Sequence, residues 1–187
     1  MVIASLVDAV SALPDRSVVG LSGFGGAGKT TLAAALAKAL TQVVVVAGDD
    51  FLDPAGCLIV TDDWAGLDRS RLRAQVLDPF HQAEPVRWQR HDWDEGLAEW
   101  HDLPPCEVVV VEGVGLLHPS LSWDLTVWLA TDPTVALSRG IARDKGRYDD
   151  HETLWRDVWT PTDIAYVARF RPDLTADLVL RPSSAAL

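Results

Sequence analysis

Residues 23–30 have the composition of a phosphate-binding loop. The segment Gly23-Phe-Gly-Gly-Ala-Gly28-Lys29-Thr30 matches the pattern G-x-x-x-x-G-K-[ST] at every fixed position. In such a loop the glycines let backbone N–H groups turn toward phosphate oxygens, the lysine adds a compact positive charge, and the threonine hydroxyl can ligate Mg²⁺. The pattern therefore predicts a nucleotide site that contains Gly23, Gly25, Gly26, Ala27, Gly28, Lys29, Thr30 and Thr31.

Acidic residues follow two apolar runs elsewhere in the chain. Asp49 and Asp50 come shortly after residues 42–47, and Glu112 ends the run 107–112. Ligands of open α/β sheets bind beyond the carboxyl ends of the strands, so we expect these acids near the loop. There, Asp49 or Asp50 could take a proton from a substrate hydroxyl or hold Mg²⁺ through water, and Glu112 could reach the same metal. A helix cap, a solvated turn or a solvent-facing strand end remain as alternatives.

These residues lie within an alternation of strand-like and helix-like segments. Apolar, largely β-branched runs predict strands at residues 17–22, 42–47, 107–112, 124–130 and 177–180. Composition and capping residues predict helices at residues 3–13, 29–40, 68–77, 94–100, 132–145 and 152–170, the last interrupted at Thr160-Pro161. Continuously apolar strands separated by helices are typical of a parallel sheet that is covered on both faces. The sequence thus predicts a doubly wound, five-stranded α/β fold.

Length, charge and cysteine content limit the functional classes. A chain of 187 residues suits one domain, and its net charge of -11 disfavours nucleic acids and anionic membrane surfaces as partners. Two cysteines are too few for a disulfide framework, and the apolar runs have only strand length. We therefore expect a cytoplasmic protein that binds neither nucleic acid nor membranes. Residues 48–106 are too long for a plain connection and predict a substrate-covering insertion, in which Asp62-Asp63-Trp64 is expected to form a surface turn.

Five segments follow one another along the chain: GFGGAGKTTLA, GDDFLDP, RWQRHDWD, VVVVEGV and LSRGIARD. Together they resemble the uridine kinase and phosphoribulokinase group of P-loop kinases, which includes nicotinamide riboside kinases and bacterial pantothenate kinases. The resemblance implies a P-loop nucleoside triphosphate hydrolase fold of the NMP-kinase-like type with a lid, and ATP and Mg²⁺ as cofactors. It also implies transfer of the γ-phosphoryl group of ATP to a small hydroxyl-bearing substrate, first of all a nucleoside. Pantothenate, a vitamin riboside or a sugar stays open as the acceptor, as do a P-loop NTPase acting on a partner protein and a homodimeric assembly.

The same resemblance suggests roles for residues after the second strand. Phe51 aligns with the Phe of the group's D-S-F or D-G-F pattern, which gives Asp49 the position of the catalytic base and leaves Asp50 as the alternative. Asp50 and Phe51 are then expected beside the acceptor. Thr30, Glu112 and Asp49 would be the residues that reach the metal.

Two later segments complete the expected site. His91-Asp92-Trp93-Asp94 resembles, in modified form, the group's N-F-D-H-P segment, so Asp92 or Asp94 is expected to bind acceptor hydroxyls. Trp93 or Trp88 would stack on a base, with plain packing as the alternative. Arg139 and Arg143 share one helix face and resemble the arginines of a lid, expected within residues 132–150, with Arg147 as a weaker candidate. The whole chain, 1–187, would form one kinase domain, and residues 53–105 would cover the acceptor.

Overall fold

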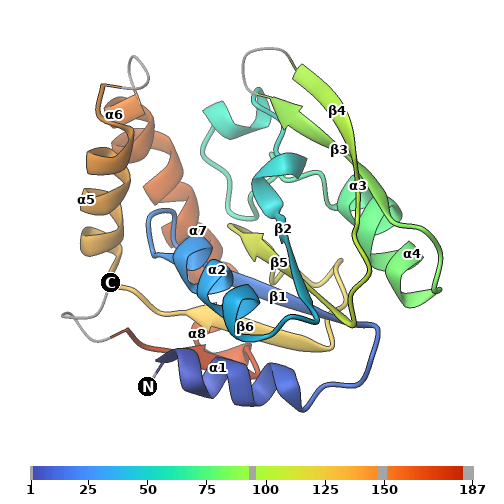
Figure 1. Cartoon of the computed structure of the whole chain (residues 1–187). Helices are drawn as coiled ribbons and strands as arrows, with labels where there is room; N and C mark the ends of the chain where they lie inside the picture. Colours follow the sequence, from blue (N-terminus) through green and yellow to red (C-terminus); the bar gives the residue numbers. More distant parts are fainter. Residues whose placement is uncertain (1, 93–95, 147–150, 183–187) are drawn as a thin grey trace.

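The computed structural model describes residues 2–92, 96–146 and 151–182. Its central element is a five-stranded sheet in the order β2-β5-β1-β6-β7 (Figure 1). The strands are β1 (Ser17–Gly23), β2 (Val43–Ala47), β5 (Val108–Gly113), β6 (Leu125–Leu129) and β7 (Leu178–Leu180). All neighbouring pairs are parallel. The expected α/β fold with a parallel five-stranded sheet is therefore confirmed.

Every residue of β1 and of β5 is buried, although successive side chains point to opposite faces of the sheet. Both faces of the sheet are therefore covered by helices and loops. The longer helices are α1 (Val2–Ser11), α2 (Lys29–Ala39), α5 (Pro133–Asp144) and α7 (Thr160–Phe170). The shorter ones are η1 (Gly48–Phe51), η2 (Gly56–Leu58), α3 (Arg69–Leu72), η3 (Arg73–Leu77), α4 (Asp78–His81), α6 (His151–Leu154), η4 (Trp155–Trp159) and α8 (Pro172–Thr175). No helix in the described ranges combines the length and the apolar character that crossing a bilayer requires.

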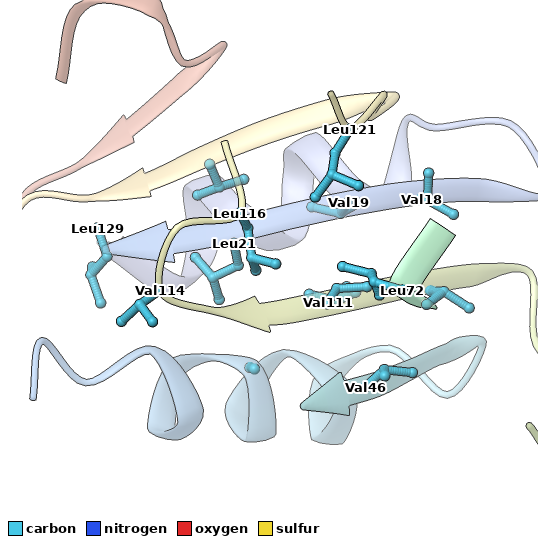
Figure 2. Close-up of a cluster of buried hydrophobic side chains, with 14 of the residues drawn as sticks. Val18, Val19, Leu21, Val46, Leu72, Val111, Val114, Leu116, Leu121 and Leu129 are labelled. Carbon is cyan, nitrogen blue, oxygen red and sulfur yellow. The ribbon is translucent and has the colours of Figure 1, made fainter. Parts of the chain in front are cut away.

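The core lies between the sheet and its covering segments (Figure 2). Its members include Val18, Val19, Leu21, Val46, Leu72, Val111, Leu116 and Leu129, each at most 1% exposed. Burial of one such side chain contributes about 1.5–3 kcal/mol to folding. This packing gives the site a rigid base at the carboxyl ends of the strands.

The strand register brings three chain segments together at one edge of the sheet. Glu112 in β5 lies opposite Leu21 in β1 and also opposite Ala47 in β2. The loop that follows β1 and the turn that follows β2 therefore both begin beside Glu112. The close approach is visible at Gly48, where an added Cβ would lie 3.0 Å from the Glu112 carbonyl oxygen.

The prediction of a helix over residues 94–100 is wrong. Residues 96–100 belong to β4 (Gly96–Asp102), which pairs antiparallel with β3 (Arg87–Asp92) in a separate two-stranded sheet. The rings of Trp88 and His101, on directly paired residues, stack at 5.6 Å between centroids. Such cross-strand aromatic contacts stabilise a hairpin and outweigh a weak local preference for helix.

The interruption expected at Thr160-Pro161 does not occur, because α6, η4 and α7 follow one another without a gap. Immediately before the proline, η4 widens into a π-helical turn, closed by a hydrogen bond from the Thr160 backbone N–H to the Trp155 carbonyl. Proline lacks an N–H and its ring crowds the preceding turn, and a widened turn accommodates both effects.

Candidate functional site

The phosphate-binding loop runs from the end of β1 to the start of α2, as the sequence predicts. Gly26 and Gly28 have φ values of 77° and 98°, a left-handed conformation that glycine adopts without strain. Gly28 is the N-cap of α2, so the backbone N–H groups of the first helical turn are directed at the space in front of the loop. Ala27 is fully buried and its carbonyl accepts a hydrogen bond from the Thr131 hydroxyl at 3.1 Å, whereas Thr31 is exposed.

Helix α5 lies directly on this loop. A Cβ added to Gly26 would come within 2.2 Å of the Ala136 carbonyl oxygen and 3.0 Å of the Gly140 nitrogen. Trp155 approaches the same region from η4, since a Cβ at Gly25 would lie 2.7 Å from its ring. Gly25 is therefore needed for space, and Gly26 for both space and conformation.

Replacing Gly26 by Ala is expected to weaken nucleotide binding at least about tenfold and to lower the free energy of unfolding by about 1–3 kcal/mol, because α5 must shift away from the loop. Gly146→Ala is a matched control: Gly146 also has a positive φ, 75°, but nothing lies within 4 Å of an added Cβ. Calorimetric titration with Mg-ADP and thermal unfolding measure both effects. Equal behaviour of the two variants would show that the contact with α5 is unimportant.

Lys29 and Thr30 hold the positions that the loop pattern predicts. Lys29 is 7% exposed, and its Nζ donates hydrogen bonds to the carbonyl oxygens of Gly23 at 3.0 Å and Phe24 at 2.9 Å. The Thr30 hydroxyl donates to Glu112 Oε1 at 3.0 Å. Burial raises the pKa of Glu112, while the nearby Lys29 charge opposes that shift. The loop lysine and the acid at the end of β5 therefore share one electrostatic environment.

Asp49 and Asp50 begin η1 directly after β2, but their surroundings differ. The Asp50 carboxylate accepts a hydrogen bond from Trp88 Nε1 at 2.8 Å and lies 3.4 Å from Arg90 Nε. Its carbonyl oxygen accepts a hydrogen bond from Arg71 at 2.7 Å. Among the described residues, no side chain or backbone group makes a hydrogen bond or ion pair with the Asp49 carboxylate. Asp50 thus ties β2 to the β3–β4 hairpin, and Asp49 keeps its oxygens available.

The environment of Asp49 favours a carboxyl group that can hold a proton. The side chain keeps access to solvent, yet surrounding protein atoms desolvate it enough to raise its pKa above the ordinary value of 3.8. The positive charges of Lys29 and Arg143 act in the opposite direction. Phe51, the next residue but one, is fully buried in the core and anchors the turn that carries both aspartates.

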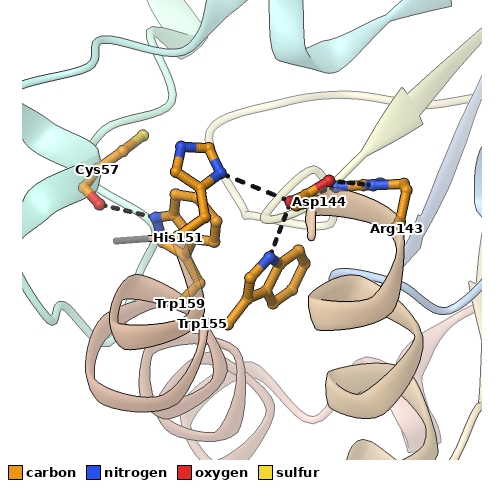
Figure 3. Close-up of polar contacts among 6 residues, drawn as sticks. All are labelled: Cys57, Arg143, Asp144, His151, Trp155 and Trp159. Carbon is orange, nitrogen blue, oxygen red and sulfur yellow. Dashed lines mark hydrogen bonds and ion pairs between the residues drawn. The ribbon is translucent and has the colours of Figure 1, made fainter. Parts of the chain in front are cut away.

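Arg143 of α5 lies near enough to this site to lower the pKa of Asp49, and it is tied to a network of buried groups (Figure 3). Arg143 Nε donates to Asp144 Oδ1 at 2.7 Å, and Trp155 Nε1 donates to Asp144 Oδ2 at 2.8 Å. Although burial works against ionisation, these hydrogen bonds hold the pKa of Asp144 below its usual value. Arg139, one turn earlier on α5, is partly buried. The arginine expected as the weaker candidate, Arg147, lies outside the described residues.

The residues expected to bind the acceptor are only partly visible. Trp93 and Asp94 lie outside the described residues, and of Asp92 only the backbone is described, at the end of β3 opposite Gly96. Trp88 is 8% exposed and bonded to Asp50, so the packing interpretation applies to it. The acceptor contacts of Asp92 and Trp93 stay predictions.

Two residues outside the predicted site are tied to the loop, Asp163 by direct contact and Trp64 through Asp163. Asp163 of α7, 4% exposed, accepts hydrogen bonds from the Gly25 backbone N–H at 2.7 Å and from Trp64 Nε1 at 2.9 Å. The surface turn expected at Asp62-Asp63-Trp64 is wrong for Trp64, which is 5% exposed and belongs to the core. A charged residue within an amphipathic helix gives no sign of burial in the sequence.

The buried acids predict how stability depends on pH. Burial raises the pKa of Asp163 to about 6 and also raises the pKa of Glu112. A carboxyl with a raised pKa binds its proton more tightly in the folded state, so the free energy of unfolding increases as the pH falls through that pKa. Burial lowers the pKa of His118, so this single group reduces the free energy of unfolding as the pH falls.

We therefore expect the free energy of unfolding to rise by about 1–3 kcal/mol between about pH 7 and pH 4.5, and to fall only below about pH 4. The fall at low pH comes from carboxyls with lowered pKa values, such as Asp144 and Asp177. Urea unfolding at a series of pH values measures this. A free energy of unfolding that falls steadily from pH 8 downward would contradict the assigned burial of these acids.

Comparisons with known proteins agree with this arrangement. A family model described as an AAA domain matches residues 19–156. Uridine-cytidine kinase C of Dictyostelium discoideum is 28% identical over 166 residues, which are 84% of this chain and 36% of that protein. The chain thus spans little more than a third of the length of this curated relative.

Two solved structures have the same fold, and each is described only as a possible kinase. A uridine kinase from Bacillus stearothermophilus superimposes with a TM-score of 0.72 at 19% identity, covering 96% of this chain and 97% of that chain. A fructose transport system kinase from Silicibacter sp. TM1040 superimposes with a TM-score of 0.74 at 24% identity, covering 96% and 98%. The family model covers the loop, both strand-end acids and the arginine helix, and the chain therefore belongs to the AAA domain family of P-loop proteins.

Proposed function

We propose that the protein is an ATP-dependent kinase that transfers the γ-phosphoryl group to a hydroxyl of a small molecule. The observation that supports this most is the grouping at one sheet edge of Lys29, the Thr30–Glu112 hydrogen bond and the carboxylate of Asp49. A carboxylate in this position can orient the hydroxyl of an alcohol and take its proton as the oxygen attacks the γ-phosphorus. The similarity to uridine-cytidine kinase C points the same way.

In this proposal the triphosphate binds along residues 23–30 and the first turn of α2. Backbone N–H groups contact the phosphate oxygens, and Lys29 moves its Nζ from the Gly23 and Phe24 carbonyls to the β- and γ-phosphates. Two oxygen donors, Thr30 and Glu112, lie 3.0 Å apart. Such a small set of hard donors suits Mg²⁺, which keeps several waters and takes further oxygens from phosphates. Thr30 and Glu112 would hold the ion, Asp49 would reach it through water, and the bound ion would neutralise phosphate charge.

Asp49 acts as the base in this mechanism. It orients the acceptor hydroxyl and takes its proton as the oxygen attacks the γ-phosphorus, while the bond to the β-phosphate oxygen breaks. Asp50 does not compete for the role, because Trp88 and Arg90 already bind its carboxylate. Asp50 instead places the hairpin over the acceptor, and Phe51 keeps both aspartates at the sheet edge.

Arg139 and Arg143 stabilise the charge of the transferring group from α5. Their shared helix face and the influence of Arg143 on the pKa values of Asp49 and Glu112 support this role. Residues 132–150 form the lid, whose closure excludes water that would otherwise accept the phosphoryl group. The chain works as one domain, and residues 53–105 cover the acceptor.

A nucleoside is the acceptor we propose first, since the chain is 28% identical over 166 residues to a uridine-cytidine kinase. A sugar follows, because a fructose transport system kinase shares the fold, and pantothenate or a vitamin riboside remains an alternative. Both cysteines are free, which suits the cytoplasm, where thiols stay reduced. Whether the protein works as a monomer or a homodimer is independent of this mechanism.

Measurement of ADP release from Mg-ATP with and without each candidate acceptor tests the proposal. The kinase mechanism predicts release that depends on one class of alcohol and saturates with its concentration. Equal release with and without every acceptor would instead support an NTPase that acts on a partner protein.

A further inference from the structure

Asp163 is the most deeply placed carboxylate near the phosphate-binding loop that the proposed mechanism does not use. It lies on α7, and its two oxygens bind groups from two distant parts of the chain. Oδ2 accepts the Gly25 backbone N–H at 2.7 Å, and Oδ1 accepts Trp64 Nε1 at 2.9 Å. One carboxylate thereby joins the phosphate-binding loop to residues 53–68, the first part of the segment proposed to cover the acceptor.

A carboxylate in this position is costly unless it is satisfied. Removing a charge from water costs several kcal/mol, and hydrogen bonds or a nearby opposite charge must offset that cost. Here two N–H donors and the positive charge of Lys29 favour the ionised form of Asp163. An apolar residue would fill the same space without the cost of burying a charge. The presence of carboxylate oxygens at Asp163 therefore requires an explanation beyond packing.

The loop side of this contact is tightly built. A Cβ on Gly25 would lie 3.6 Å from Asp163 Oδ2 and 2.7 Å from the Trp155 ring, so the helical segment meets the bare backbone of the loop. Gly25 is the third residue of the phosphate-binding pattern and precedes the left-handed turn at Gly26. Fixing the Gly25 amide therefore fixes the direction in which the following loop amides point.

On the other side of Asp163, the backbone of Trp64 has an unfavourable conformation. Trp64 has a φ of 55°, a left-handed conformation that is rare for a large side chain and costs about 1–3 kcal/mol. It also packs so closely against Gly115 that a Cβ there would lie 2.5 Å from its own Cβ. The hydrogen bond to Asp163 is the polar interaction that holds the indole in this place.

We propose that Asp163 is a positioning residue that sets the phosphate-binding loop through Gly25 and the acceptor-covering segment through Trp64. Nucleotide affinity and the order of residues 53–68 then depend on the same carboxylate. This inference rests on the proposed function in one respect, namely that the loop binds a nucleotide.

The variant Asp163→Asn tests the first part of the proposal, that Asp163 positions the phosphate-binding loop through Gly25. The amide can accept only one of the two N–H groups and turns its own NH₂ toward the other, so we expect Mg-ADP to bind about tenfold more weakly by calorimetric titration. Asp157→Asn, an exposed change in the neighbouring η4, is the control and should stay within about twofold of the unsubstituted protein. Titrations are made at a temperature where circular dichroism shows every variant folded.

Trp64→Phe tests the link to residues 53–68 and leaves the hydrogen bond between Gly25 and Asp163 in place. It keeps an aromatic ring but removes the indole N–H, so amide hydrogen exchange in residues 53–68 should accelerate about tenfold. Mg-ADP affinity should remain within about twofold, because the Gly25 contact persists. Trp123→Phe removes a comparable indole hydrogen bond, to the Leu116 carbonyl, and should leave exchange in residues 53–68 unchanged.

The outcomes separate this inference from the proposed function. If Asp163→Asn binds Mg-ADP as tightly as the unsubstituted protein and loses only thermal stability, the carboxylate is merely structural and the inference is wrong. If Trp64→Phe and Trp123→Phe show equal exchange, the link to the covering segment is wrong, even where Asp163→Asn fails to fold. If the unsubstituted protein does not bind Mg-ADP, the proposed function fails and the role of Asp163 in nucleotide binding fails with it.

Discussion

Replacing Asp49 by Asn is expected to lower the rate of phosphoryl transfer by about 10²–10⁴-fold, the usual contribution of a positioned general base. Asparagine preserves the shape of the side chain but cannot take a proton from the acceptor hydroxyl. Mg-ADP should bind at least as tightly as before, since the variant removes a negative charge beside Lys29 and the phosphates. Steady-state assays with a saturating acceptor and calorimetry with Mg-ADP measure the two effects separately.

Asp50→Asn is the matched control, one residue away and with the same change of charge. Its carboxylate binds Trp88 and Arg90, so the variant should raise the acceptor KM and change kcat less than about tenfold. If Asp50→Asn abolishes transfer and Asp49→Asn does not, the assignment of the base is displaced by one residue. If neither variant matters, the sheet edge after β2 is not the place where the hydroxyl is deprotonated.

Replacing Lys29 by Ala is expected to impair both nucleotide binding and turnover. The loss of one charge-assisted contact to the phosphates should weaken Mg-ATP binding about 10–100-fold. A further loss in kcat of about 10²–10³-fold is expected, because the charge is most needed when the phosphoryl group is between its two oxygens. The buried ammonium also binds the Gly23 and Phe24 carbonyls, so the free loop should become more mobile.

Lys38→Ala provides the control on the same helix. Lys38 is exposed near the end of α2, far along the helix from the loop, and its removal should change neither Kd nor kcat by more than about twofold. An unchanged rate for Lys29→Ala would contradict the assignment of residues 23–30 as the phosphate site.

The sheet and the loop could be predicted because their signals are local. Runs such as residues 107–112 are apolar at almost every position, which suits a strand buried on both faces, and glycine spacing at residues 23–28 has few structural alternatives. The expected closeness of Glu112 to Thr30 follows from parallel pairing alone, since all strand ends meet at one edge.

The hairpin and the contacts of Asp163 could not be predicted because they depend on distant partners. Residues 96–102 become a strand through pairing with residues 87–92, and nothing within the segment itself requires that partner. Asp163 resembles any solvated helix residue until the Gly25 and Trp64 donors, 138 and 99 positions away, are placed beside it. Asp50 likewise reveals its structural role only through Trp88.

Mass analysis of the product formed from Mg-ATP and a panel of alcohols tests the central claim most directly. The panel should contain uridine, cytidine, nicotinamide riboside, pantothenate and several sugars, and Asp49→Asn should be run in parallel. We predict that one class of acceptor gains the mass of a single phosphoryl group, together with an equal amount of ADP and a loss of product in the variant. ADP and inorganic phosphate formed at the same rate with every acceptor, and equally by Asp49→Asn, would contradict it.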